Sequence, residues 1–222
     1  MAILTLLVSL TNPFYDGNFF LPIRSLSMFS NPSGLGVSPG AEAFVTYNPE
    51  TERITAGASA GYLGFGYIKE DTFQIYEVGV GYSLPGAFTV GYAYEFGDTS
   101  VHILGVECRP NQQLALSYKT GFGEKKYMFG GVGIMPYLHY ITLNFGLAYE
   151  GIDDTMAIYY GARITPIRGL SVFFTADKEF NWNAGLELSF GYGKIAGMYS
   201  YETTKFSGGL LISSQKYETF LP

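Results

Sequence analysis

Few residues of this chain have the chemistry of catalysis or metal binding. Its cysteine and histidines are Cys108, His102 and His139. One thiol excludes a disulfide within these residues, and one Cys with two His does not form an obvious zinc site. Neither His has a Ser or acid at a spacing that identifies a catalytic dyad, and the motifs of serine hydrolases, zinc proteases and phosphate loops are absent. We therefore expect no enzyme, no cofactor and no metal.

The charge balance argues against a nucleic-acid partner. The sequence holds 13 Lys and Arg against 19 Asp and Glu, for a net charge of −6. Binding to phosphates needs a basic face, and no basic stripe is present. Charged residues are only 14% of the sequence, against about 25% in a typical soluble domain. With 17% aromatic residues and 29 Gly, this composition favours strands and tight turns.

Most of the chain after Glu42 shows the two-residue alternation of β-strands. In segment 88–96, large apolar residues occupy every second position, with Thr, Gly, Ala and Glu between them. Segments 75–84, 139–150 and 182–192 repeat this pattern. Since successive side chains of a strand point to opposite faces, each segment has one large apolar face and one small or polar face.

Turn signals divide this region into a series of hairpins. Short groups of Asn, Pro, Gly, Asp and Lys, from 48–51 to 166–169, recur about every 10–14 residues. No helical pattern intervenes, so parallel βαβ units are not expected. We predict an all-β fold, a closed antiparallel barrel of about 14 strands, within limits of roughly 12 and 16. The segments 61–68 and 128–137 are the hardest to divide into strands.

Alternation alone leaves open whether the apolar face points inward or outward. The other face is too poor in charge for a water-exposed surface, and about 14 strands enclose a lumen too wide for one layer of side chains. Aromatic residues at strand ends, as in the girdles of transmembrane barrels, are Tyr76, Tyr82, Phe96, Tyr118, Tyr149, Trp182, Tyr192 and Tyr201. These features favour a transmembrane barrel with lipid outside. The alternative is a soluble barrel or two-sheet protein with the apolar face inside.

In a transmembrane barrel, the charged residues of the small faces line the lumen. They are Glu77, Glu95, Glu107, Lys119, Arg163, Asp177, Glu187 and Glu202. Charges in a narrow lumen need partners, water or protonation, so we expect Lys119 and Arg163 to pair with some of the acids. Either these residues form a solvated network that supports the barrel, or they select permeating ions, in which case the excess of acids favours cations.

The N-terminal residues lack this alternation. Residues 1–10 are apolar enough for the core of a signal peptide, but they have no preceding Lys or Arg and no clear cleavage site. They are either a signal peptide or a remnant of one, or part of the mature protein. Residues 11–41 predict an irregular or partly helical segment before a barrel at 42–222.

Five residues of this segment, Asn31, Pro32, Ser33, Gly34 and Leu35, resemble a family signature. The Asn-Pro-Ala-Gly-Leu signature precedes the first strand in outer-membrane barrels of the FadL-type transporter superfamily and the related PorV-type secretion barrels; here Ser replaces Ala. The resemblance implies an outer-membrane barrel whose N-terminal segment folds inside it as a hatch. Pro32 restricts Asn31 to extended conformations, and Gly34 and Gly36 permit close packing against a wall. The alternative is an ordinary loop.

Three functions follow as hypotheses. The first is passage of a small or hydrophobic molecule across the outer membrane, past the hatch. The second is a non-conducting barrel that anchors a secretion or protease partner of the cell envelope. The third, a membrane-embedded hydrolase, depends on His102 or His139. The expected partners are outer-membrane lipid, a small hydrophobic ligand and an envelope protein.

Overall fold

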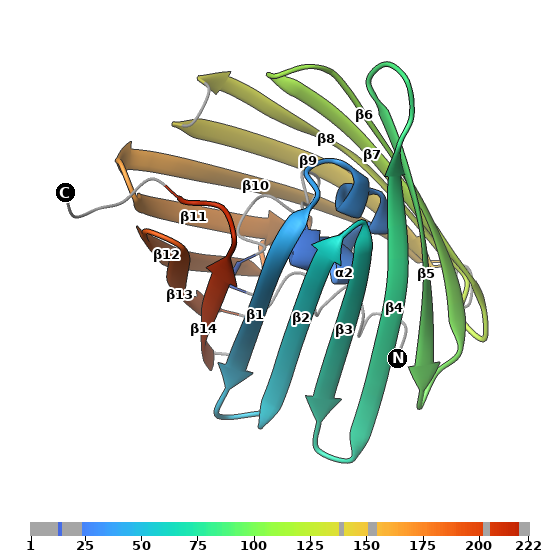
Figure 1. Cartoon of the computed structure of the whole chain (residues 1–222). Helices are drawn as coiled ribbons and strands as arrows, with labels where there is room; N and C mark the ends of the chain where they lie inside the picture. Colours follow the sequence, from blue (N-terminus) through green and yellow to red (C-terminus); the bar gives the residue numbers. More distant parts are fainter. Residues whose placement is uncertain (1–12, 15–23, 138–139, 151–154, 202–204, 218–222) are drawn as a thin grey trace.

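The chain forms a closed antiparallel barrel. The computed structural model describes residues 13–14, 24–137, 140–150, 155–201 and 205–217. Its strands are β1 (Gly40–Asn48), β2 (Arg53–Gly61), β3 (Leu63–Glu70), β4 (Phe73–Ser83), β5 (Phe88–Gly97), β6 (Val101–Asn111), β7 (Leu114–Gly123), β8 (Tyr127–Tyr137), β9 (Ile141–Glu150), β10 (Thr155–Ile167), β11 (Leu170–Asp177), β12 (Trp182–Phe190), β13 (Gly193–Ser200) and β14 (Lys205–Ser213). The predicted barrel of about 14 strands is confirmed (Figure 1).

The first and last strands close the barrel. Val45 of β1 lies opposite Ala56 of β2 on one side and opposite Leu210 of β14 on the other. Every other pairing joins strands that are consecutive in the chain. Closure leaves no sheet edge with unpaired backbone groups, which is the condition for strands to lie in a membrane.

Three prolines interrupt the ladder at one end of the barrel. The register shifts between Cys108 and Asn111, between Ile134 and Tyr137, and between Ile164 and Ile167. Pro110, Pro136 and Pro166 lie in these gaps, and proline has no N–H to donate to a neighbouring strand. All three lie toward the end at which β1 begins and β14 finishes. We call this the terminal end, and the opposite one the distal end.

Alternation of burial follows the predicted faces. In β5, Thr89, Gly91, Ala93 and Glu95 face inward and are buried, whereas the residues between them face outward. The predicted segments needed correction at their ends. β1 begins at Gly40, two residues before Glu42. Segment 182–192 includes a turn, because β12 ends at Phe190 and Gly191 has φ of +62°.

The structure also defines the strands in the two segments that were hardest to divide from the sequence. Gly61, with φ of +62°, separates β2 from β3 inside segment 61–68, because glycine adopts this left-handed conformation without strain. Segment 128–137 belongs to the single strand β8.

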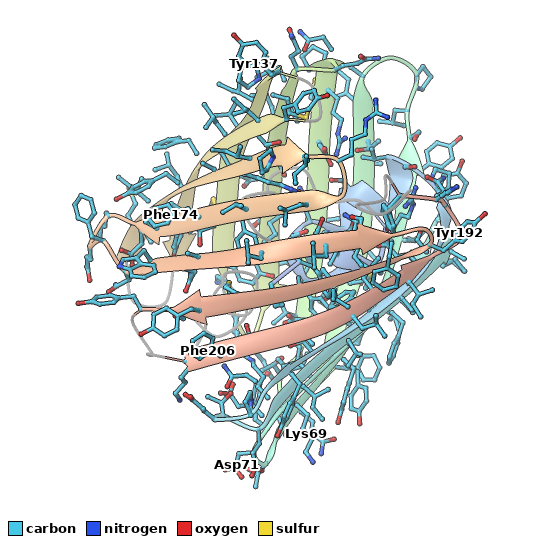
Figure 2. All side chains as sticks on the ribbon, turned by 90° about the vertical axis from the view of Figure 1, so that its left-hand side faces the viewer. Lys69, Asp71, Tyr137, Phe174, Tyr192 and Phe206 are labelled. Carbon is cyan, nitrogen blue, oxygen red and sulfur yellow. The ribbon has the colours of Figure 1, made fainter. Side chains whose placement is uncertain are left out.

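Aromatic side chains surround the outer wall near both ends (Figure 2). At the distal end the outward rings include Tyr47, Tyr67, Tyr76, Phe96, Phe122, Trp182, Tyr201 and Phe206. At the terminal end they include Tyr62, Tyr82, Phe88, Tyr137, Phe190 and Tyr192. Of the eight aromatic residues expected at strand ends, Tyr118 lies in the middle of β7. Neighbouring rings stack, as Trp182 and Tyr201 do with centroids 5.3 Å apart.

A short helical segment lies within the ring of strands (Figure 1). It consists of η1 (Arg24–Leu26), α2 (Ser27–Ser30) and η2 (Pro32–Gly36), and we call residues 24–36 the inner segment. The partly helical character predicted for 11–41 is confirmed for these residues; most of 1–23 lies outside the described residues. Among the described residues, no helix has the length and apolar character needed to cross a membrane.

The pairing of β1 with β14 can be tested with an engineered disulfide between the two strands. In a Cys108→Ser background, Val45→Cys with Leu210→Cys is expected to cross-link fully under mild oxidation, because directly paired strand residues meet the Cα separation that a disulfide requires. The measurement is mobility on a non-reducing gel. The control pair, Val45→Cys with Leu186→Cys on β12, is expected to remain reduced. Equal cross-linking of both pairs would contradict the closed register.

Candidate functional site: the inner wall

A row of glycines on the inner wall seats the inner segment. Gly81 of β4, Gly91 of β5 and Gly105 of β6 lie directly opposite one another across adjacent strands. A Cβ atom at Gly91 would collide with the backbone of Pro32 and Ser33. A Cβ at Gly105 would collide with the side-chain oxygen of Asn31. The three glycines therefore form a shallow groove in the inner wall. Because they have no side chains, η2 can pack directly against their backbone.

Asn31 ties this segment to the wall. Its Nδ2 atom donates to Ser117 Oγ at 2.7 Å and to the Tyr118 carbonyl at 3.1 Å. Its Oδ1 atom accepts from the backbone N–H and the hydroxyl of Ser33, at 3.1 and 2.8 Å. Asn31 is extended, with φ of −155°, as expected before Pro32. The residue thus caps η2 and bonds to β7, and its Nδ2 atom also donates to the Val106 carbonyl of β6 at 3.4 Å.

The apolar residues of the inner segment fill the space beside the groove. Met28, Phe29 and Leu35 are each at most 2% exposed. A Cβ at Gly36 would lie 2.8 Å from the backbone of Tyr82, which confirms that Gly36 permits close contact with the wall. The motif residues 31–35 are all buried.

Glu77, Glu95 and Lys119 lie together beneath the inner segment. Glu77 and Glu95 are directly opposite one another on β4 and β5, and both are buried. Neither carboxyl oxygen of Glu95 has a hydrogen-bond partner in the described part of the chain. Lys119 was expected to pair with acids, but its Nζ instead donates to the Phe29 carbonyl at 3.2 Å. No ion pair of Lys119 within 4 Å occurs among the described residues. Its contact fixes the inner segment to β7.

A second charged cluster lies on the inner wall of β10 to β13. The Glu187 Oε1 atom accepts from Arg163 Nη2 at 2.5 Å and from Lys194 Nζ at 2.9 Å. Arg163 also donates to Ser171 Oγ at 2.9 Å. The predicted pairing of Arg163 with an acid is confirmed. Lys194 was not singled out from the sequence, although alternation along β13 places it inward, diagonally opposite Glu187.

Two other ion pairs, both toward the terminal end, were missed as well. Glu107 was expected on the inner wall and is buried there; it pairs with Arg109 of its own strand at 2.5 Å. Arg24 of η1 pairs with Glu42 of β1 at 3.4 Å. Alternation along β6 could have indicated Arg109, which shares a face with Glu107. No periodic signal points to Arg24, because it lies in the irregular segment.

The C-terminal residues join the Arg24–Glu42 pair. Tyr217 donates its hydroxyl proton to Glu42 Oε2 at 2.6 Å, and its ring lies 4.4 Å from Lys194 Nζ. Burial, with Glu42 beside it, raises the pKa of Tyr217, which keeps the hydroxyl protonated as a donor. Arg24 also donates to Ser213 Oγ at 3.3 Å. The terminal end therefore joins the inner segment, β1, β13 and the C-terminal residues in one network.

Asp177, another predicted lumen residue, takes part in a turn. Asp177 lies at the end of β11, where its Oδ1 accepts from the backbone N–H groups of Glu179 and Asn181 at 2.8 and 3.0 Å. It stabilises the β11–β12 turn, which is a frequent role of Asp at strand ends. Alternation along β11 places Asp177 on the inward face, as predicted, at the distal rim. Glu202 lies outside the described residues.

His102 lies on the outer wall among aromatic rings. Its Nδ1 atom is 2.7 Å from the Tyr92 hydroxyl, and its ring lies 4.9 Å from Tyr94 and 5.4 Å from Phe122. His139 is outside the described residues. Within the described ranges, no group of three or more His, Cys, Asp or Glu could hold a metal ion.

Comparison with solved structures shows the fold. A triple mutant of a Rhodopseudomonas blastica porin superimposes with a TM-score of 0.52 at 8% identity, over 79% of this chain and 99% of the porin chain. A second variant of that porin gives 0.51 at 9% identity over the same shares. The chain has a porin-like fold. No family model matches the sequence, and no curated protein matches it.

The glycine groove predicts how the inner segment can be displaced. Gly91→Val is expected to release it while the barrel stays closed, because the clash with Pro32 and Ser33 costs about 1–3 kcal/mol. A Ser33→Cys probe in a Cys108→Ser background should then react with maleimide about tenfold faster. The matched control is Gly197→Val on the outer wall, where a Cβ meets nothing nearer than 3.9 Å. Equal labelling rates would contradict the seating of η2.

Proposed function

We propose that this chain spans a membrane of the bacterial outer-membrane type, and that a small solute passes through it past the inner segment. The observation that carries the proposal is the polarity of the wall. Outward side chains such as Val80, Leu104, Leu143, Leu186 and Ile212 are large, apolar and at least 43% exposed. Inward side chains carry the ion pairs. This is the reverse of a protein that buries its apolar face from water.

The extent of this surface favours lipid over water. Every strand except β2 carries at least one large apolar residue that is at least 38% exposed. A monomeric soluble protein rarely exposes an apolar patch of more than a few hundred Å². The aromatic rings at both ends match the interfacial girdles of membrane barrels. In a bilayer, lipid would cover the outer wall, and the backbone N–H and C=O groups would be satisfied by the hydrogen bonds between the strands.

The resemblance to FadL- and PorV-type barrels supports a hatch. Residues 31–35 are buried against β4, β5 and β6, as a hatch would be. The inner segment contacts mainly the first half of the barrel, whereas Arg163 and Lys194 on the opposite wall keep 18% and 16% of their side chains exposed. We propose that the solute passes along this second, polar wall.

A second candidate function is a non-conducting barrel that anchors an envelope protein. The attachment of the inner segment favours it, because Arg24 bonds to Ser213 of β14, whereas Asn31 and the Phe29 carbonyl both bond to β7. A segment held at three points can remain a permanent plug. We propose no enzymatic role for His102, which lies among aromatic rings on the lipid side.

Passage can be tested in liposomes. The wild-type barrel is expected to admit small sugars in a swelling assay, and Gly91→Val is expected to admit them several-fold faster, because it unseats the inner segment from the glycine groove. Gly197→Val, with the same added volume on the outer wall, should match the wild type. A gel verifies that the inserted barrel is folded: the unboiled protein should migrate at a different rate from the boiled protein. If neither the wild type nor Gly91→Val admits solute, passage is wrong and the anchoring function takes its place.

A further inference from the structure

Two groups of ion pairs toward the terminal end, those of Glu107 and Glu187, expose their cations and bury their acids. Glu107 is 0% exposed and its partner Arg109 is 29% exposed. Glu187 is 3% exposed, against 18% for Arg163 and 16% for Lys194. At these described ion pairs the more accessible charge is therefore positive, although the whole chain carries a net charge of −6.

Among the described residues, the cluster around Glu187 holds two cations and one acid. Arg163 and Lys194 both donate to the same Glu187 oxygen, at 2.5 and 2.9 Å, so two cations share one acid. Their nitrogen atoms consequently lie within about 6 Å of each other, a distance at which both can contact one small anion. The hydroxyl groups of Ser171 and Thr165, 3.0 Å apart, lie beside Arg163.

The rest of the described inner wall does not cancel this charge. The Arg24–Glu42 pair at the terminal end is neutral and buried. Glu77 and Glu95 are buried near the distal end, beneath the inner segment, with Lys119 and Lys125 close by. At the distal rim, Glu70 is the more exposed partner of Arg53, at 26% against 12%. The accessible positive charge is thus concentrated toward the terminal end.

We infer that Arg163 and Lys194 form a binding site for the carboxylate or phosphate group of small anionic solutes, which makes passage selective for anions. This inference rests on the proposed passage of solute. Arg presents a planar fork that matches carboxylate and phosphate, and the Lys ammonium adds a second charge. Glu187 holds the two cations in place, and Ser171 and Thr165 supply hydroxyl groups. Because burial decides which charges a solute meets, the selectivity is opposite to the one that the excess of acids predicts.

The first experiment measures the zero-current potential in planar bilayers across a KCl gradient. The wild type is expected to favour chloride over potassium. The variant Arg163→Gln/Glu187→Gln/Lys194→Gln removes the cluster without leaving a buried charge unpaired. It should lower the chloride-to-potassium permeability ratio about sixteenfold, because one unit charge at about 5 Å in water favours chloride about fourfold and disfavours potassium about fourfold. The control Lys69→Gln/Lys126→Gln removes two charges outside the lumen and should leave the ratio unchanged.

Failure of this inference is distinguishable from failure of passage. A wild type that favours potassium, or a triple variant with the wild-type ratio, overturns the inference while passage stands. A barrel that conducts nothing overturns passage. In that case, calorimetric titration of the folded barrel in detergent decides the site, with inorganic phosphate in one arm and acetate in the other. Saturable binding that the triple variant loses supports the site, and heats equal to those of the triple variant overturn it.

Discussion

The pairing of β1 with β14 is the interaction on which the rest of the structure depends. It turns a meander of hairpins into a surface with an inside and an outside. It also satisfies the edge groups that would otherwise need water, so that the outer wall can be apolar throughout. Once the sheet is closed, the side chains of each strand point alternately to the inside and to the outside of the barrel. The small inward residues then leave a lumen that one layer of side chains does not fill.

The two halves of the inner wall differ in what occupies the lumen beside them. On β4 to β6 the Gly81–Gly91–Gly105 row lets the inner segment approach the backbone, and buried groups such as Asn31 and Lys119 hold it there. On β10 to β13 the wall keeps an ion network that is partly exposed. The first half of the barrel is therefore packed like a protein core, and the second half retains the groups that can meet a solute.

The sequence predicts the parts of this structure that depend on a two-residue period. Segments 75–84 and 88–96 alternate so regularly that strands, faces and antiparallel pairing follow from them. The end of β12 was missed because Gly191 and Tyr192 continue the alternation through the turn. Arg24 contacts Glu42 from a segment without a period. The sign of the accessible charge could not be predicted by counting residues, since it depends on which partner of each pair is buried, as Glu187 is.

The claim that the outer wall faces lipid is tested most directly at Trp182, the single tryptophan of the chain. Trp182 lies at the distal start of β12, where its ring stacks with Tyr201. In liposomes, its fluorescence should be quenched most strongly by lipids brominated near the headgroups, because girdle rings lie at that level. In Trp182→Phe/Leu186→Trp, the strongest quenching should move to bromines about 10 Å deeper, because the two positions lie about 13 Å apart along a strand tilted by about 40°. Equal, weak quenching by all brominated lipids in both proteins would contradict a membrane-facing wall.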